Sequence, residues 1–342
     1  MSLRAELVRL GLRWFVKRKI GPATTLEALR RQDAFLERLV PPPPKGTQAT
    51  HVDLDGVKAV AVVTLASLDG RLVLYLHGGG HVSGSPALYG DFTWRIAAAT
   101  RARTVILDHR LAPEHPFPAA LDDAVTAYRA LVADGADLRR MAVLGESSGG
   151  GLVLAMLLKL RDEGFRLPAA AVALSPWTDL ALTGGSLQRN AEADPMLRGT
   201  EGARLASYYL AGADPRTPYA SPLYADPTGL PPTLIQVGSD EILLDDSVRM
   251  AERMRAAGCQ VELEIWPRMP HTWQVWARVL PEARAAIERI GAFVQSKVEP
   301  QAVRQKARAP GLGAAQVGFT LSLPRPGRHV LGSDLNRSDS RR

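Results

Sequence analysis

The chain lacks several features that mark whole classes of protein. Its single cysteine, Cys259, excludes an internal disulfide framework. No stretch approaches the roughly 18 to 20 continuous apolar residues of a membrane span, and the N-terminus has no apolar stretch with a cleavage site typical of a signal peptide. With 46% hydrophobic residues in 342, the chain can still bury a large core. We therefore expect a globular, cytoplasmic protein.

The chain also lacks an evenly spread positive charge, although its formal net charge is +7. Residues 1–20 carry +5 and residues 301–342 carry +6, so the body between them carries −4. A basic surface for nucleic acid would place the excess on the folded centre. The distribution predicts no nucleic-acid partner.

The two ends differ in pattern. Residues 3–20 have apolar side chains near helical spacing with basic residues between them, which predicts an amphipathic helix. Its apolar residues are Leu3, Leu7, Leu10, Trp14 and Phe15. That face covers another part of the protein or adsorbs to an anionic membrane; we favour the first, because surface anchoring usually needs a second signal. Residues 301–342 lose all periodicity, which predicts a disordered tail.

A second predicted helix, residues 24–40, stops at four prolines. From residue 51 onward, short apolar runs of strand length alternate with helical segments. The runs are residues 57–66, 71–77, 103–109, 141–146, 169–175, 232–239 and 261–266. This alternation predicts a mostly parallel α/β sheet covered on both faces. Residues 185–220 interrupt it with a long excursion that contains a predicted helix at 201–212, as lids and binding loops do.

The sequence GESSG at residues 145–149 follows one predicted strand and precedes a helix. In that context GxSxG forms a sharp turn that lifts its central serine above the sheet edge, so Ser147 is the candidate nucleophile. HGGG at 77–80 follows another strand, and consecutive glycines let backbone N–H groups converge on an oxyanion. A phosphate-cradling turn is the alternative, but the motif lacks the P-loop lysine and the GxGxxG spacing.

Two further loops follow successive strands at the same sheet edge, in the order Ser, acid, His. Asp240 lies in GSDEILLDDS and His271 in PRMPHTW. We prefer Asp240 as the acid because it comes first after the strand. Its rivals are Glu241, Asp245 and Asp246.

These blocks resemble the bacterial hormone-sensitive-lipase family of α/β-hydrolase esterases. HGGG, DHRLAPEHPFPAALDD, GESSGG, SPWTDL, SDEILLDD and PHTW all stand in the family's order between about residues 30 and 297. The resemblance implies an α/β-hydrolase fold, with a mostly parallel central sheet, helices on both faces and a helical cap. It divides the chain into N-terminal cap helices (1–45), a core in two parts (46–184 and 221–300), a cap insertion (185–220) and the tail (301–342).

The resemblance further implies a serine carboxylesterase for short-to-medium acyl esters that uses no metal or organic cofactor. Ser147 would attack the ester, His271 would move the proton and Asp240 would orient the imidazole. Gly78, Gly79 and the N–H of Ser148 would form the oxyanion hole. His77 and Gly80 would shape that loop. The expected partner is a small-molecule ester, membrane-surface contact is not expected, and a homodimer is left open.

The chain departs from the family at several positions. Glu146 and Ser148 stand where Asp and Ala are usual, and His109 where Tyr is common. His81 replaces a common aromatic and is a candidate pocket residue, together with Tyr208 and Trp177, although a polar loop residue is the simpler interpretation of His81. A lactone, carbamate or amide hydrolase, or an acyltransferase, would use the same triad. A non-catalytic receptor on this fold is expected to lose the base.

Overall fold

The computed structural model describes residues 2–18, 21 and 24–298. Its centre is an eight-stranded sheet in the order β1-β2-β4-β3-β5-β6-β7-β8. The strands are β1 (Gln48–Leu54), β2 (Val57–Val63), β3 (Leu72–Leu76), β4 (Arg103–Leu107), β5 (Met141–Glu146), β6 (Ala170–Leu174), β7 (Thr233–Gly238) and β8 (Val261–Trp266). Pairing is antiparallel where β2 meets β1 and β4, and parallel elsewhere. The α/β-hydrolase fold predicted from the sequence is confirmed.

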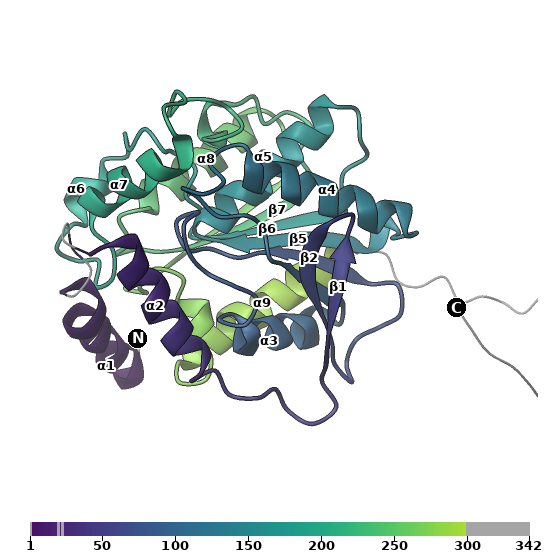
Figure 1. Ribbon diagram of the computed structural model, residues 1–342, viewed down its shortest axis with the longest axis horizontal. Helices are drawn as coiled ribbons and strands as arrows, with labels where there is room; N and C mark the ends of the chain where they lie inside the picture. The colour runs from purple at the N-terminus through teal and green to yellow at the C-terminus, as the bar shows by residue number, and fades with distance from the viewer. Residues whose placement is uncertain (1, 19–20, 22–23, 299–342) are drawn as a thin grey trace, which may run out of the picture. The chain divides into compact units, whose positions relative to one another are not determined.

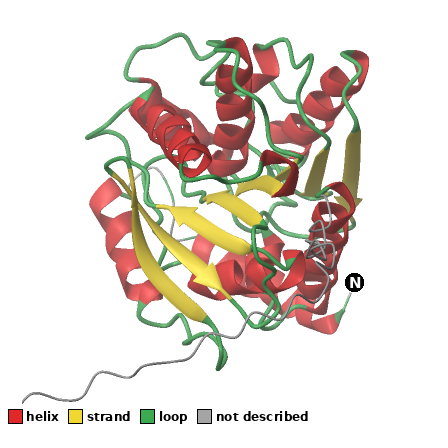
Figure 2. Ribbon diagram, turned by 90° about the vertical axis from the view of Figure 1, so that its right-hand side faces the viewer, coloured by secondary structure: helices red, strands yellow, loops and turns green. Residues whose placement is uncertain are grey.

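Helices cover both faces of this sheet (Figures 1 and 2). On one face lie α4 (Ala119–Ala133), α5 (Ser148–Asp162) and α8 (Leu244–Ala256); on the other lie α3 (Gly90–Thr100) and α9 (Pro281–Lys297). Alternate residues of β3 serve the two layers: Leu74 and Leu76 belong to one apolar cluster, and Val73 and Tyr75 to the other. Strand periodicity of two thus builds both cores at once.

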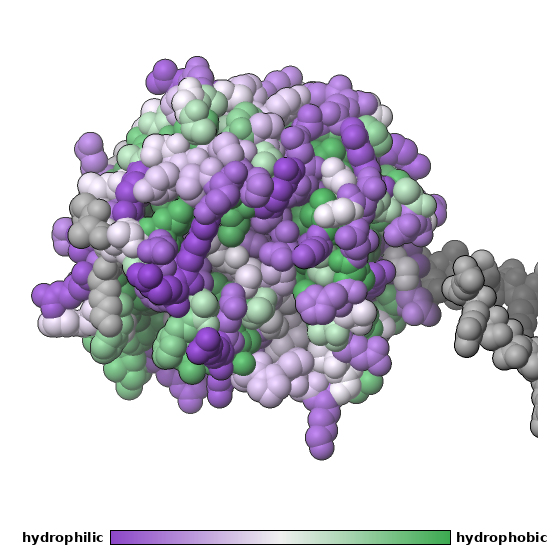
Figure 3. Space-filling model, viewed as in Figure 1, coloured by the Kyte–Doolittle hydropathy of each residue, from purple (hydrophilic) through white to green (hydrophobic). Residues whose placement is uncertain are grey.

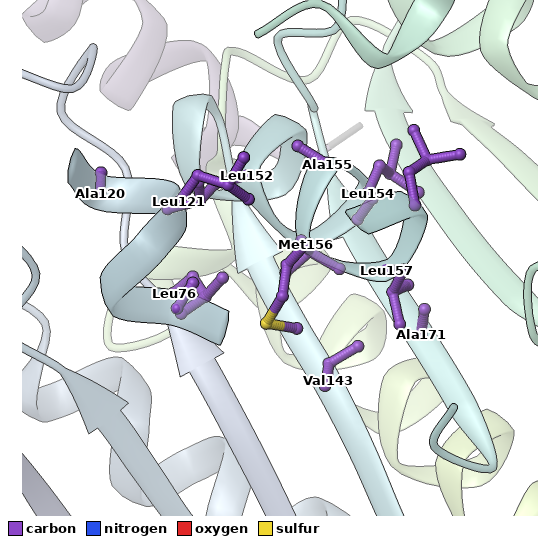
Figure 4. Packing of buried hydrophobic residues seen from close by; sticks show 14 of the residues in the cluster. Leu76, Ala120, Leu121, Val143, Leu152, Leu154, Ala155, Met156, Leu157 and Ala171 are labelled. Carbon is purple, nitrogen blue, oxygen red and sulfur yellow. The ribbon is translucent and has the colours of Figure 1, made fainter. Parts of the chain in front are cut away.

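Helix α5 is the central element of the larger core. Twelve of its residues are buried, from Ser148 to Leu160. Figure 4 shows Met156 directed from this helix toward the strands, near Leu76 and Val143. Because α5 starts immediately after Ser147, this packing fixes the position of the residue that precedes it.

The remaining helices form the region that the sequence predicted as a cap. They are α1 (Leu3–Leu12), the π-helical η1 (Arg13–Lys17), α2 (Leu26–Glu37), α6 (Ser186–Arg189) and α7 (Gly199–Leu210). In Figure 1 they gather at one end of the sheet. Three short 3-10 turns precede or follow core elements, at Leu138–Arg140, Pro222–Tyr224 and Trp273–Trp276.

Two elements of the fold were not predicted from the sequence, and one prediction concerns residues that the structure does not describe. The sequence patterns gave neither β1 nor α9; β1 is almost wholly exposed, so it has no apolar alternation to detect. The prediction of a disordered tail at 301–342 lies outside the described residues. In the described part of the chain no helix is both long enough and apolar enough to cross a bilayer.

Candidate active site

Ser147 lies at a strained turn between β5 and α5. Its φ of 57° and ψ of −124° are rare for a residue with a side chain. The turn is held from both sides, since its N–H donates to Leu174 O at 2.8 Å and its carbonyl accepts from the N–H of Trp177 at 2.9 Å. A Cβ on Gly149 would lie 2.1 Å from Leu76 O, so only glycine allows the helix to start this close to β3. The sequence context predicted this elbow correctly.

A chain of two hydrogen bonds runs from Ser147 through His271 to Glu241. His271 Nε2 lies 2.9 Å from Ser147 Oγ, and His271 Nδ1 lies 2.8 Å from Glu241 Oε2. Because a carboxylate accepts, Nδ1 carries the proton and Nε2 is left to accept from the serine hydroxyl. The three side chains come from the ends of β5, β7 and β8, at one edge of the sheet.

Asp240 does not occupy the position predicted for it. The turn after β7 directs Glu241 back toward the sheet, where Oε1 accepts from the N–H of Gly238 at 2.5 Å and from Ser175 Oγ at 2.7 Å. Asp240 points the other way and pairs with Arg9 at 2.7 Å. The acid prediction was therefore wrong by one residue, because the residue first after the strand is the one that the turn directs away from His271.

The other two rival acids bind backbone elsewhere. Asp245 accepts from the N–H of Ser186 at 2.9 Å, and Asp246 accepts from the N–H groups of Thr178 and Asp179 at 2.8 and 2.9 Å. Both tie loops to the start of α8. Neither reaches His271.

The protonation of His271 reflects two opposing effects. Burial disfavours the charged imidazolium and is the largest single influence, but the hydrogen bond and the charge of Glu241, together with the charges of Asp194 and Glu146, outweigh it. The pKa of His271 is therefore raised above its ordinary 6.5. Glu241 is the group that stabilises positive charge on this ring.

The HGGG loop offers a different pair of N–H donors from the pair that the sequence predicted. The Gly78 N–H donates to Glu146 Oε1 at 2.5 Å, so the prediction that Gly78 is an oxyanion donor was wrong. Among the described residues, the N–H groups of Gly79, Gly80 and Ser148 have no acceptor in the hydrogen-bond network. Gly79 adopts a φ of 109°, and a Cβ there would lie 2.1 Å from Ser83 O. Gly79 and Gly80 line the cavity beside Ser147.

Buried polar groups hold this loop in place. His77 Nδ1 lies 2.8 Å from Gly78 O, which agrees with its predicted role in shaping the loop. Burial lowers the pKa of His77 to about 4 and raises that of Glu146 to about 7. Ser148 Oγ accepts the His81 N–H at 3.2 Å, so the serine found where alanine is usual tethers the end of the loop.

A cavity of about 600 Å³ opens beside Ser147 and His271. Trp177 lines it as predicted, but His81 and Tyr208 do not. His81 is buried and stacks flat on Tyr209, with ring centroids 3.7 Å apart, because α7 turns Tyr209 and not Tyr208 toward the core. The apolar lining comes from several cap and loop elements: Leu12, Phe15, Leu29, Leu36, Leu182, Leu187, Leu197, Leu205, Ile242 and Leu243.

The cap insertion contacts the turn that carries Glu241, and the sequence did not predict these contacts. Asn190 Nδ2 donates to Ser239 O at 3.0 Å and to Glu241 O at 2.7 Å, and Asp194 Oδ2 accepts from the N–H of Ile242 at 3.0 Å. The cap insertion therefore holds the backbone on both sides of Glu241. Two polar residues in an irregular loop carry no periodic signal that would have revealed this.

Comparisons with known proteins identify the family of this chain. A family model described as an alpha/beta hydrolase fold matches residues 73–275. An acetyl-hydrolase of Streptomyces hygroscopicus is 42% identical, covering 86% of this chain and 97% of its own. A putative acetyl-hydrolase, LipR, of Mycobacterium tuberculosis is 32% identical, covering 89% of this chain and 99% of its own.

Solved structures give the same assignment. The crystal structure of an esterase from the bacterial hormone-sensitive lipase family superposes with a TM-score of 0.83 at 42% identity, covering 87% of this chain and 99% of that one. The esterase EstE5, soaked with p-nitrophenyl butyrate, gives 0.82 at 39% identity over the same shares. The chain therefore belongs to the bacterial hormone-sensitive lipase family of α/β-hydrolases and is a carboxylic ester hydrolase.

Proposed function

We propose that the protein hydrolyses short-to-medium acyl esters through a Ser147–His271–Glu241 triad and an acyl-enzyme. The observation that carries the proposal is the unbroken pair of hydrogen bonds at 2.9 and 2.8 Å, located where the cavity meets the glycine loop. This arrangement differs from the Ser-His-Asp triad predicted from the sequence only in its acid.

In the first half of the reaction Ser147 Oγ bonds to the ester carbonyl carbon while His271 Nε2 takes its proton. The carbonyl oxygen becomes an anion, for which the N–H groups of Gly79, Gly80 and Ser148 are the donors that remain. His271 then gives the proton to the departing alkoxide, which leaves as the alcohol. Glu241 stabilises the imidazolium throughout.

In the second half water replaces the alcohol. His271 Nε2 takes a proton from the water, whose oxygen bonds to the acyl carbon, and then returns that proton to Ser147 Oγ as the carboxylic acid leaves. Since His271 must be neutral to act as a base and its pKa is raised above 6.5, activity should rise with pH through and beyond that value.

Replacing the nucleophile tests this proposal. Ser147→Ala should reduce hydrolysis of p-nitrophenyl butyrate by several orders of magnitude with an unchanged melting temperature. Ser148→Ala is the matched control, because its backbone N–H is retained, and it should lose far less activity. If the control lost activity and Ser147→Ala did not, the assignment would be wrong.

The acyl length is a separate part of the proposal. The cavity has the size typical of small-molecule sites. We expect kcat/KM to be highest for acyl chains of up to about eight carbons and to fall beyond that length, because each methylene that the cavity does not accommodate changes the transition-state free energy by about 1 to 3 kcal/mol, or roughly 5- to 150-fold in rate. A p-nitrophenyl ester series, with a lactone and an anilide beside it, measures both length and bond preference. Faster hydrolysis of the lactone or the anilide would reassign the substrate class.

The location in the cytoplasm remains a prediction from the sequence. Cell fractionation with an activity assay would test it. Recovery of all activity outside the cells would contradict it.

A further inference from the structure

The outer face of α1 and η1 is apolar and open to solvent. Its five large side chains are 53% to 77% exposed: Leu3, Leu7, Leu10, Trp14 and Phe15. Figure 3 shows apolar surface gathered where Figure 1 places α1. The expectation that this face covers another part of the protein is therefore wrong for the described residues. Contiguous apolar surface of this kind marks an interaction site in most soluble proteins.

The opposite face of the same segment is held down by charged side chains. Arg9 donates to Arg268 O at 2.6 Å and pairs with Asp240 at 2.7 Å. Lys17 Nζ donates to Ala191 O at 2.5 Å and to Asp194 O at 2.6 Å. Together with the buried Ala5 and Leu12, these polar contacts fix the segment to the body and leave the leucines of the outer face in solvent.

Positive charge surrounds this apolar face. Arg4, Arg13 and Arg18 are exposed, and the guanidinium of Arg18 lies over the Trp14 ring at 3.9 Å. Glu6 is the single acidic residue in the described segment 2–18, and Arg268 pairs with it at 2.9 Å. A stripe of Leu and Trp bordered by arginines matches the boundary between the acyl chains and the headgroups of an anionic bilayer.

The apolar face continues into the active-site cavity. Phe15 and Leu36 are both exposed at the surface and part of the cavity lining. The same cavity reaches Ser147 and His271. A hydrophobic molecule could therefore pass from the outer face to the nucleophile along apolar side chains.

We propose that the outer face of α1 and η1 docks on anionic lipid bilayers and places the cavity mouth at the membrane. The substrates would then be lipophilic esters dissolved in the bilayer. The docking stands on the exposed face alone, whereas the choice of substrate rests on the proposed esterase function. Docking concerns where the enzyme works, and the cavity still sets the acyl length.

Vesicle cosedimentation tests the docking without any reaction. The full chain should pellet with phosphatidylglycerol vesicles at least tenfold more strongly than with phosphatidylcholine vesicles. Because the arginines supply the difference, 0.5 M salt should reduce binding to the anionic vesicles. Arg4→Gln should weaken that binding by a smaller factor.

The triple variant Leu3→Gln, Leu7→Gln, Leu10→Gln removes the three leucines of the apolar face without changing the cavity lining. It should lose at least tenfold in vesicle affinity while its turnover of soluble p-nitrophenyl butyrate stays unchanged. The matched control is Leu65→Gln with Phe165→Gln, two exposed apolar residues elsewhere in the chain. The control should bind as the wild type does.

Three outcomes would overturn the docking. The wild type could fail to bind anionic vesicles, bind neutral ones equally, or bind undiminished in the triple variant. Analytical ultracentrifugation adds an alternative occupant: a wild-type dimer that dissociates in the triple variant, without vesicle binding, would show that a second copy covers the face. If the wild type bound anionic vesicles but hydrolysed no ester, the proposed function would be refuted and the docking would still be supported.

Discussion

Two helices border the active site and differ in how much of their apolar surface is buried. Helix α5 starts at the nucleophile and buries apolar residues along nearly its whole length. Helix α1 contributes to the cavity wall but buries just Ala5, Arg9 and Leu12, while its other three leucines face solvent. One helix is held by many apolar side chains, and the other by two apolar residues and a buried arginine.

The difference separates stability from substrate handling. Each fully buried Leu or Val of α5 contributes about 1.5 to 3 kcal/mol, so the nucleophile precedes a helix that is firmly held in the core. The α1–η1 segment buries only Ala5 and Leu12 among its apolar residues and otherwise depends on the polar contacts of the buried Arg9 and Lys17, so much less apolar area holds it to the fold. Changes in the core should therefore abolish chemistry or folding, and changes at the cap should alter how substrate is bound.

The largest expected effect is at Glu241. Glu241→Gln keeps the size of the side chain but removes the charge that stabilises the imidazolium, so kcat should fall by about a thousandfold or more. Because the same charge helps to raise the pKa of His271, the acidic limb of the pH–rate profile should move to lower pH. The measurement is kcat against pH with p-nitrophenyl butyrate.

Asp240→Asn is the matched control for that change. Its carboxylate contacts Arg9 and not His271, so kcat should fall less than about tenfold. If Asp240→Asn cost more than Glu241→Gln, the acid assigned from the sequence would be restored.

Two glycines extend the comparison to stability. In Gly149→Ala the new Cβ would lie 2.1 Å from Leu76 O and 2.5 Å from His77 O, so we expect a loss of about 3 kcal/mol or more. In Gly11→Ala on α1 the Cβ meets no atom within 4 Å, and the better helix propensity should add up to about 1 kcal/mol. Urea unfolding measures both. Equal changes in the two variants would show that core and cap do not differ in this way.

Glu146 links the core to the pH dependence of stability. Burial raises its pKa from 4.5 to about 7, so its contribution to stability is fully present below pH 4.5 and is lost as pH rises toward 7. Glu146→Gln does not titrate. Between pH 4.5 and 7, the unfolding free energy of the wild type should therefore fall relative to that of the variant by at most about 3 kcal/mol. Parallel pH profiles for the two proteins would contradict this.

The sequence predicted what periodicity and motifs encode. Apolar strands in alternation gave the sheet, and GESSG and PHTW placed Ser147 and His271 at one edge. The sequence did not reveal which acid follows β7 into the site, because Asp240 and Glu241 both carry a carboxylate. The backbone conformation of the turn decides which of the two faces the histidine.

The orientation of α1 was lost for a different reason. A hydrophobic pattern shows which residues share a face but not whether that face turns inward. Here Arg9 and Lys17 bind carbonyl and carboxylate groups on loops that are far away in the sequence. Those partners cannot be identified before the chain is folded. The same limit applies to Gly78, whose N–H was predicted to serve the oxyanion and instead donates to Glu146.

A smaller effect than that of Glu241→Gln is expected at the pair of Arg9 and Asp240, where the cap meets the turn that carries Glu241. Their side chains are 10% and 18% exposed, so solvent weakens the pair, and we expect a coupling of about 1 to 2 kcal/mol. A double-mutant cycle with Arg9→Met and Asp240→Asn isolates that coupling from the bond between Arg9 and Arg268 O. Arg13→Met is the control, because the exposed Arg13 donates to the Glu192 carbonyl at 2.7 Å and does not pair with Asp240.

The kinetic outcome of that cycle decides what the contact does. Arg9→Met should raise KM more than it lowers kcat, since the pair positions the cap over the cavity while Asn190 and Asp194 still hold the backbone around Glu241. A fall in kcat with KM unchanged would mean that Arg9 acts through Glu241. In that case the cap and the triad would form one unit, and the contrast between α1 and α5 would fail at the point where the two regions touch.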